Sequence, residues 1–490
     1  MRRARTMNNK VERALVAVDL GAQSCRVSLL RWVGGEPEIR VVHRFANAPI
    51  ETALGLRWDI LQIVEGVKDG LRRCAFATER IAAIGVDGWG VDYVRIDDEG
   101  RLLGNPFCYR DERTNRAAEE VFRKISSEEI YRLTGVQLLN LNTLYQLYAD
   151  KLAGVQGRAR WVTIPEYVTH LLGGRIVSEY TEATHTQLVA LGKREWCEQI
   201  FRATGLERAA APEIVPTGTV LGNLKCELGE LPAFRETKLI VPACHDTASA
   251  IAAIPAAGED WAFISSGTWS LVGTVLEKAC VTEEAREKNF TNLGGVGGTI
   301  CFLKNVNGMW LIQQCLEEWE KCGRRWELDE LIRACEKLPT PETLIDVDEA
   351  SLLLQGRMPE KINEWIAAAG GTRLLPGEAG ASTMAAVIFH SLAEKYAEVI
   401  ASVAKITGKN LKRLFIVGGG SRNAYLNRLT AERTGMAVIA GPSECTTIGN
   451  FAIQIAALRG ETTPGIGVSA EAVARYAAQL SARSFVAGAG

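Results

Sequence analysis

Two glycine turns, each between two strand-like runs, constrain the fold of this chain more than any other feature. The first turn, at Gly21, joins the apolar runs Ala14–Leu20 and Arg26–Trp32. The second separates Ala262–Ser265 from Ser270–Val275. Short apolar runs bounded by glycine are typical of β-hairpins. The two halves resemble each other in this pattern and not in their residues, and we expect two α/β domains of similar design.

Further strand and helix patterns follow each predicted hairpin. In the first half they predict a helix over Ile60–Cys74, a strand over Ile81–Asp87 and a mainly helical section over residues 114–191. In the second half, a long amphipathic helix is expected from about Ser382 to Ile406. This order predicts two domains, residues 1–243 and 244–490, with a cleft between them.

The composition supports this organisation and excludes several functions. A chain of 490 residues is too long for one ordinary hydrophobic core. Its 47% hydrophobic and 23% charged residues are typical of soluble globular proteins. A formal net charge of −2 provides no global field that would attract nucleic acid or an anionic membrane. Since no apolar run is long enough to cross a bilayer, we expect a cytoplasmic protein without a membrane or nucleic-acid partner, and no obligatory protein partner is evident.

The cysteines and the N-terminus give weaker indications. The 12 cysteines show no C-x-x-C pair and no framework spacing. Cys108, Cys244 and Cys301 sit among apolar residues, and we expect these three thiols to be buried and inert. The N-terminus is basic, with Arg2, Arg3, Arg5, Lys10 and Arg13. Because it lacks the apolar stretch of a signal peptide, we expect a loose extension, with a transit peptide as the alternative.

The first hairpin turn carries small and polar residues between Asp19 and Arg26. Backbone N–H groups at such a tip can converge on an anion. Asp19, at the end of a buried strand, could hold a hydrated Mg²⁺ beside a phosphate. An ordinary β-turn with a capping aspartate is the alternative.

Three consecutive glycines, Gly418 to Gly420, follow the apolar strand Leu414–Val417 and precede a helix over Asn423–Thr434. Glycines let a backbone approach a flat or anionic ligand closely, and the helix N-terminus adds a favourable dipole. A flexible loop is the alternative. Three glycines in a tight turn lose conformational entropy on folding, and this cost favours the ligand-binding interpretation over a flexible loop.

A polar triplet, His245-Asp246-Thr247, follows the apolar run Leu239–Val241. Asp246 could accept a proton from a hydroxyl group, and the glycine turn at Ser266-Gly267-Thr268 could bind a phosphate. A base and a phosphate cradle on neighbouring elements are what phosphoryl transfer to an alcohol requires. Alternatively, Asp246 caps a helix over Thr247–Ala253 and His245 is a packing residue.

Trp89 lies between Gly88 and Gly90 in the string GVDGWGVD. Two flanking glycines could expose an indole face on which a saccharide packs. A hairpin turn with a core tryptophan is the equally weighted alternative.

Other common catalytic motifs are absent or misplaced. The chain contains no G-x-x-x-x-G-K-[ST], no H-E-x-x-H and no G-x-S-x-G. A G-x-G-x-x-A match at Gly465 follows Thr462-Thr463-Pro464 and not a strand, which argues against a dinucleotide site.

With these motifs the chain resembles the FGGY family of carbohydrate kinases, whose domains have the actin-like (ribonuclease H-like) ATPase fold. The resemblance extends from about Val16 to Leu458. It is carried by the strings AVDLGAQSCRVSLL, GVDGWGVDYVRIDDEG, YRDERTN, NTLYQL, HDTASA, SSGTWSLVG, LKNVNGMWLIQ, IVGGGSRNAYLN and VIAGPSE. It implies two such domains with the active site in the cleft between them.

The resemblance also implies roles for individual residues. Asp246 would be the catalytic base, and Asp19 would assist Mg²⁺. The implied ATP-binding residues are Ala22, Gln23, Ser24, Cys25, Arg26, Thr268, Gln313 and Gly419. The implied sugar-binding residues are Gly90, His245, Asp246, Thr247 and Asn305. Cys25 departs from the pattern, because similar kinases more typically have glycine there.

The reaction that the resemblance implies is ATP-dependent phosphorylation of L-rhamnulose at its C1 hydroxyl, with Mg²⁺ as cofactor. The same chemistry on fuculose, xylulose or ribulose is the nearer alternative, because a methyl pocket discriminates by only about 1–3 kcal/mol. A non-catalytic sugar or nucleotide sensor is the more distant alternative. Such a sensor would need neither the base nor the metal carboxylate.

Overall fold

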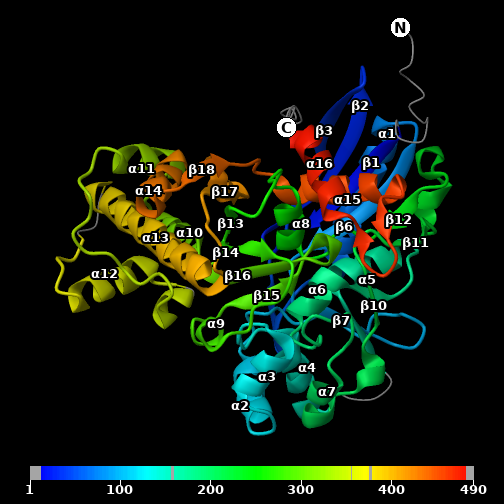
Figure 1. The fold of residues 1–490 in the computed structure, drawn as a ribbon, viewed down its shortest axis with the longest axis horizontal. Coiled ribbons are helices and arrows are strands. Elements are labelled where there is room, and N and C mark those ends of the chain that lie inside the picture. Colours follow the sequence, from blue (N-terminus) through cyan, green and yellow to red (C-terminus); the bar gives the residue numbers. More distant parts are fainter. Residues whose placement is uncertain (1–12, 156–158, 355, 375–377, 482–490) are drawn as a thin grey trace. The chain divides into compact units, whose positions relative to one another are not determined.

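The computed structural model describes residues 13–155, 159–354, 356–374 and 378–481 (Figure 1). Strands and helices alternate along most of this length, so the predicted α/β class is confirmed. The predicted basic extension over residues 1–12 lies outside the described part.

The first sheet has six strands in the order β11-β12-β6-β1-β2-β3. Its strands are β1 (Ala14–Leu20), β2 (Ser24–Val33), β3 (Glu36–Ala46), β6 (Ile81–Gly88), β11 (Val220–Asn223) and β12 (Lys238–Ile240). β1 pairs antiparallel with β2, as the glycine turn predicts, and parallel with β6. Both β1 and β6 are buried over their whole length, because both are central strands.

Helices cover this sheet. α1 (Ile60–Ala77) packs on β2 and β3, α5 (Ile164–Leu171) on β6, and α15 (Cys445–Leu458) on both β1 and β6. The parallel register sets Asp19 of β1 beside Asp87 of β6, at the carboxyl ends of the two strands. Ligands of open α/β sheets bind outside these ends, so the sheet positions a candidate site there.

The section predicted to be mainly helical is helical with short strands inserted. Its helices are α2 (Arg113–Phe122), α3 (Ser127–Thr134), α4 (Thr143–Leu152), α5 and α6 (Tyr180–His185), followed by α7 (Glu198–Thr204). The short strands β7 (Tyr93–Ile96) and β8 (Arg160–Thr163) pair antiparallel, and β9 (Val177–Glu179) pairs with β10 (Glu213–Val215). A separate apolar cluster that includes Tyr145, Trp161 and Trp196 forms its core.

The second sheet has the order β15-β16-β14-β13-β17-β18. Its strands are β13 (Trp261–Ser266), β14 (Trp269–Leu276), β15 (Thr291–Gly294), β16 (Ile300–Asn307), β17 (Arg413–Val417) and β18 (Ala437–Ala440). β13 and β14 form the second predicted hairpin, and β13, β17 and β18 are parallel.

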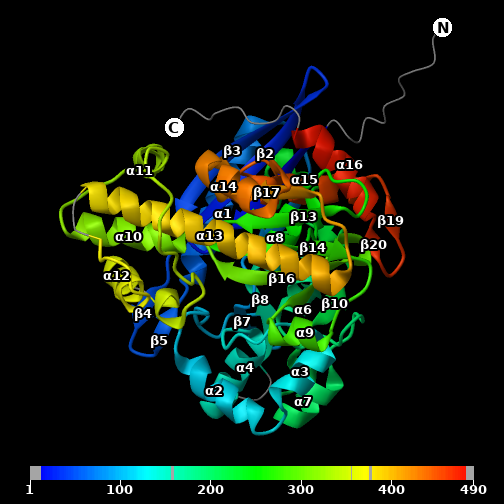
Figure 2. The same ribbon diagram turned by 60° about the vertical axis from the view of Figure 1, so that its left-hand side comes forward.

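Helices α10 (Trp310–Lys321), α11 (Leu328–Cys335), α12 (Met358–Ala368), α13 (Glu378–Thr407) and α14 (Ala424–Thr434) accompany the second sheet. The long α13 packs against α14 and α11 and runs beside α10 (Figure 2). Its Tyr396 hydroxyl lies 2.6 Å from Ser270 Oγ of β14, which ties the helix to the hairpin.

The chain divides into two compact units. One comprises residues 1–255, 276–302 and 445–490, and the other comprises residues 256–275 and 303–444. α15 and α16 (Ala470–Ser481) therefore belong with the first sheet although they are the last two helices of the described residues. The predicted boundary near residue 243 and the predicted cleft stay predictions.

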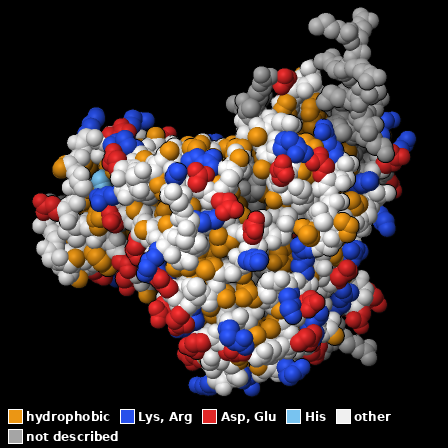
Figure 3. Space-filling view, in the orientation of Figure 1, with side chains coloured by type: hydrophobic (Ala, Val, Ile, Leu, Met, Phe, Trp, Pro, Cys, Tyr) orange, Lys and Arg blue, Asp and Glu red, His pale blue; other side chains and the backbone are white. Residues whose placement is uncertain are grey.

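The surface agrees with the charge balance of the sequence. On the face shown in Figure 3, basic and acidic side chains are interspersed, without a dominant patch of one sign. Among the described helices, none combines the length and the apolar character that a membrane span requires.

Candidate active site

The first hairpin turn is tight and is held from one side. A Cβ atom on Gly21 would lie 2.5 Å from the carbonyl oxygen of Ser24, so only glycine fits. Asn47 donates from its side chain to the Gly21 carbonyl and from its backbone to the Gln23 carbonyl, both at 3.0 Å. Sequence reasoning missed Asn47, because no local pattern links it to a turn 26 residues away.

Asp19 and Arg26 face each other across this hairpin. They are register partners on β1 and β2, and Arg26 Nη1 donates to Asp19 Oδ2 at 2.7 Å. Asp19 is 4% exposed, so its carboxylate charge lies at the edge of the core and is offset by the guanidinium.

Cys25 lies in an ordinary extended strand opposite Leu20 and has no positive φ. The thiol is buried, and burial raises its pKa to about 12. The thiol therefore stays protonated and is not itself an anion-binding group. Cysteine at this position conflicts with no backbone requirement of the turn.

Asp87 is a further carboxylate at the same strand ends that the sequence analysis did not select. It is fully buried, and Asn450 of α15 donates to its Oδ2 at 2.7 Å. Burial raises the pKa of Asp87 well above its ordinary value, and the nearby charges of Asp19 and Asp246 raise it further. The signal in the sequence that could have identified Asp87 is its position at the carboxyl end of the predicted strand over Ile81–Asp87.

Asp246 is the first residue of α8 (Asp246–Ala252). His245 occupies the N-cap position without a side-chain capping bond, so the capping alternative for Asp246 is wrong by one residue. The side chain of Asp246 is 32% exposed and accepts a 3.1 Å hydrogen bond from Thr247 Oγ1. Burial raises its pKa to about 6, although the Thr247 hydrogen bonds and the Arg26 charge oppose this. A partly accessible carboxylate of raised pKa is suited to accept a proton.

One histidine lies beside this carboxylate, and a second histidine lies against the first. His245 Nε2 is 3.7 Å from Asp246 Oδ1, and the His245 and His185 rings are 4.3 Å apart. Burial lowers the pKa of His245 to about 4, and burial together with His245 lowers that of His185. Both rings are therefore neutral at physiological pH and can serve as hydrogen-bonding groups. His185 was not selected from the sequence.

The Trp89 loop differs from the sugar-platform prediction. Trp89 is buried, its ring centroid is 4.7 Å from that of Trp58, and its indole N–H donates to Asp92 Oδ2 at 3.0 Å. The exposed-indole interpretation is therefore wrong, and the core alternative holds. Gly90, the next residue, has no room for a side chain, because a Cβ atom there would lie 2.0 Å from His185 Nδ1.

In the second unit, the tip of the β13–β14 hairpin is joined to α10. Met309 N and Trp310 N donate to the carbonyl oxygens of Gly267 and Thr268, at 3.0 and 3.1 Å. This places Gln313, one turn further along α10, near the tip. Gly267 is exposed and Thr268 is half-buried, so the tip is accessible to a ligand.

The three glycines after β17 have different environments. Cβ atoms on Gly418 and Gly420 would lie 2.7 Å and 2.0 Å from Ser266 oxygens, and Gly418 also has a φ of +83°. Gly419 is exposed and has open space where its Cβ would be. Packing against β13 thus requires two of the glycines, and Gly419 is the one of the three with open space beside it.

Asn305 and Gln313 complete the predicted residues of this unit. Asn305 is half-buried on β16. Gln313 Oε1 is buried without a hydrogen-bond partner among the described residues. Such a group is uncommon in native proteins and is a candidate acceptor for a ligand.

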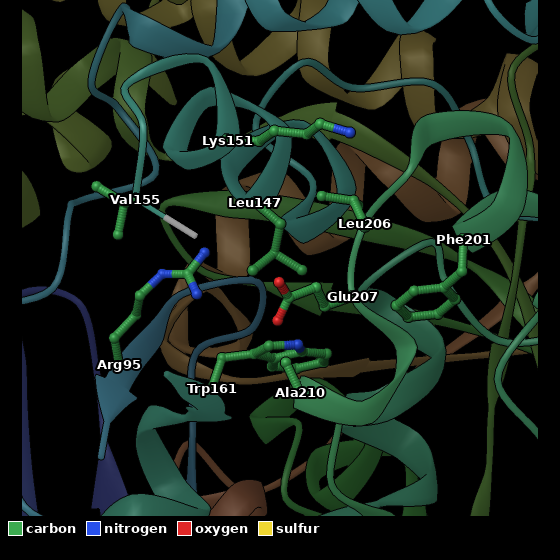
Figure 4. Close-up of a pocket in the computed structure, with 9 residues that line it drawn as sticks. All are labelled: Arg95, Leu147, Lys151, Val155, Trp161, Phe201, Leu206, Glu207 and Ala210. Carbon is green, nitrogen blue, oxygen red and sulfur yellow. The ribbon is translucent and has the colours of Figure 1, made fainter. Parts of the chain in front are cut away.

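A small pocket elsewhere carries no ligand site. It lies near α4 and α7, and Arg95 and Glu207 extend toward its centre (Figure 4). Its volume of about 30 Å³ is enough for a water molecule and not for a sugar or a nucleotide. Within the described residues, no group of three His, Cys, Asp or Glu side chains could hold a metal ion.

Comparisons with known proteins agree over almost the whole chain. Residues 14–253 match the N-terminal domain of the FGGY family of carbohydrate kinases, and residues 262–458 match its C-terminal domain. A rhamnulokinase of Bacteroides thetaiotaomicron is 36% identical over 457 residues, 92% of each chain. A rhamnulokinase of Enterococcus faecalis is 35% identical over 450 residues, 91% of this chain and 90% of that protein.

Solved structures share the fold at lower sequence identity. A ligand-bound xylulose kinase from Lactobacillus acidophilus aligns with a TM-score of 0.73 at 15% identity, covering 95% of this chain and 96% of that one. A Plasmodium falciparum glycerol kinase with ADP aligns with a TM-score of 0.72 at 15% identity, covering 95% and 92%. With the two domain matches and the relatives above, these findings show that the chain belongs to the FGGY family of carbohydrate kinases.

Proposed function

We propose that this protein transfers the γ-phosphoryl group of ATP to the C1 hydroxyl of L-rhamnulose, giving L-rhamnulose 1-phosphate and ADP. The relatives named as rhamnulokinases support this substrate. The observation that carries the proposal is the carboxylate of Asp246, which is partly exposed, has a pKa raised to about 6 and lies beside the neutral ring of His245.

Asp246 acts as the general base in this proposal. Its pKa lies far enough below neutral pH for the carboxylate to be ionised, and it is high enough to make it a better proton acceptor than an ordinary aspartate. The proton of the sugar hydroxyl passes to Asp246 as the hydroxyl oxygen bonds to phosphorus. His245, Thr247, Gly90 and Asn305 are the proposed sugar contacts.

ATP is assigned to two groups of residues. Residues 22–26 of the first hairpin offer backbone N–H groups, the Ser24 hydroxyl and the Arg26 guanidinium to the phosphates. Thr268, Gln313 and Gly419 are the proposed nucleotide contacts of the second unit, and each lies at an accessible or unpaired position described above. The transition state of phosphoryl transfer is largely dissociative, so positioning and charge neutralisation supply most of the acceleration.

Asp19 is the proposed carboxylate partner of Mg²⁺. Mg²⁺ in kinases uses one or two carboxylates together with phosphate oxygens and waters, so a dedicated protein cage is not needed. Asp19 provides one carboxylate at the ends of the central strands, which is enough for that donor set. When bound, the ion would neutralise phosphate charge.

The test is ADP release by the purified protein across a panel of ketoses: L-rhamnulose, L-fuculose, xylulose and ribulose. We expect the highest kcat/KM with L-rhamnulose. A higher kcat/KM with another ketose would show that this ketose is the substrate, and the proposed phosphoryl transfer would stand. The absence of ADP release with every sugar, under conditions where ATP binds, would favour a non-catalytic sensor.

A further inference from the structure

One short buried segment contacts both loops that carry the proposed sugar and base residues. It consists of Glu179, at the end of β9, and the six residues of α6 that follow it. On one side it contacts the loop before Asp246, and on the other side it contacts the loop at Gly90.

The contacts to the Asp246 loop are made by Glu179 and Thr181. Glu179 Oε2 accepts a 3.0 Å hydrogen bond from Cys244 N. Thr181 Oγ1 accepts a 3.3 Å hydrogen bond from His245 N. The two consecutive N–H groups that precede Asp246 are therefore both held by this segment.

Glu179 and Thr181 also fix each other. Thr181 Oγ1 donates its single proton to Glu179 Oε2, so its lone pairs are left to face His245 N. Glu179 accepts further hydrogen bonds from Thr181 N at 3.0 Å and from Thr217 Oγ1 at 2.5 Å. Its buried carboxylate is fully used in holding other groups, as a buried charge must be.

The contacts to the Gly90 loop are made by the rest of α6. Glu182 Oε1 accepts a 3.2 Å hydrogen bond from Val91 N. Val91 has a φ of +71°, which is strained for a β-branched residue and requires support from its surroundings. His185 lies against Gly90, and its ring also packs at a tilt on the ring of His245, so it touches both loops.

We propose that Thr181, through Glu179, is a positioning residue that sets the place of Asp246 relative to the sugar loop. This inference rests on the proposed function. It assigns to Thr181 no contact with sugar or ATP. A displacement of about 1 Å at a reacting group can lower the rate by about a hundredfold, so the two backbone hydrogen bonds before Asp246 matter for kcat.

Matched substitutions of buried threonines test this role. Thr181→Val is isosteric and removes the hydroxyl, whereas Thr181→Ser keeps it. Thr204→Val is the control, because Thr204 is equally buried in the same unit. Its Oγ1 makes only local hydrogen bonds among the described residues: it donates to Ile200 O at 2.7 Å and Phe201 O at 3.3 Å, and it accepts from Leu206 N at 3.4 Å. For each variant, kcat and KM for both substrates, the Tm and amide hydrogen exchange of the peptide covering residues 243–247 are measured.

The expected result is a kcat at least about tenfold lower in Thr181→Val, with the KM for ATP unchanged and the Tm close to that of Thr204→Val. Exchange in the 243–247 peptide is faster in Thr181→Val alone, and Thr181→Ser restores both readouts. Equal kcat and equal exchange in Thr181→Val and Thr204→Val would overturn the inference.

Two further outcomes are informative. If Thr181→Val does not fold, Glu179→Gln takes its place, since the amide keeps the shape and removes the charge, and the same two readouts decide. If the unaltered protein releases no ADP with any ketose, the proposed function fails, and exchange in the 243–247 peptide still tests the positioning role.

Discussion

The guanidinium of Arg26 donates to the carboxylate of Asp19 at 2.7 Å, across the hairpin to which the ATP phosphates are assigned. Both side chains are largely buried, and Asp87 lies beside Asp19 in the neighbouring strand. Arg26 is the cation that offsets the charge of Asp19. The same side chain is the proposed phosphate ligand, so Arg26 would both pair with Asp19 and contact the phosphates of ATP.

Arg26→Gln should raise the KM for ATP at least about tenfold, because a charge-assisted contact to phosphate is lost. The KM for the ketose should change little. Arg31→Gln is the matched control. Arg31 lies on the same strand but away from the turn, and its guanidinium pairs with the Glu38 carboxylate at a distance of 2.5 Å. Steady-state kinetics with varied ATP decides, and equal KM values in the two variants would contradict the role of Arg26.

Activity should fall on the acid side with an apparent pKa of about 6. Burial raises the pKa of Asp246 to about 6, and the base works only when ionised, so kcat/KM for the ketose decreases as the pH falls through that value. The measurement is kcat/KM from pH 4.5 to 8, with Tm recorded at each pH to exclude unfolding. A flat profile down to pH 4.5 would count against Asp246 as the base.

The glycines after β17 should separate packing from binding. Gly418→Ala and Gly420→Ala should lower the Tm, because the added methyl group meets Ser266 at 2.7 and 2.0 Å. Gly419→Ala should keep the Tm and raise the KM for ATP. Thermal unfolding together with kinetics checks both. A Tm loss in Gly419→Ala, or none in the other two, would contradict the assignment.

Gly90→Ala should be destabilising because of His185. The new methyl group would lie 2.0 Å from His185 Nδ1 in a buried position, and overpacking of this kind typically costs about 1–3 kcal/mol. The double variant Gly90→Ala/His185→Ala should regain part of the free energy of unfolding. Denaturant unfolding of the single and double variants tests this, and strictly additive losses would show that the two positions are not coupled.

The sequence predicted the elements that have a local signature. The Gly21 hairpin, α1 and the strand over Ile81–Asp87 follow from apolar periodicity and glycine punctuation, and the structure confirms them with bounds that shift by a few residues. Asp246 could be identified from the sequence as a candidate base, because a polar triplet after an apolar strand is itself a local pattern.

Groups held by distant partners could not be predicted in this way. Asp87 is held by Asn450, 363 residues away, and the loop before Asp246 by Glu179, 65 residues away from Cys244. The exposed-indole interpretation of Trp89 is wrong for the same reason. Its flanking glycines suggest exposure, and only the tertiary contacts with Trp58 and Asp92 bury it.

Ketose-dependent ADP production by Asp246→Asn tests the central claim most directly. The amide keeps the size of the side chain and cannot accept the proton, so kcat should fall by about a hundredfold or more, while the ketose still binds in calorimetry. The Tm at pH 8 should not fall, because burial destabilises the ionised carboxylate that the substitution removes. ADP production close to that of the unaltered protein would contradict the account.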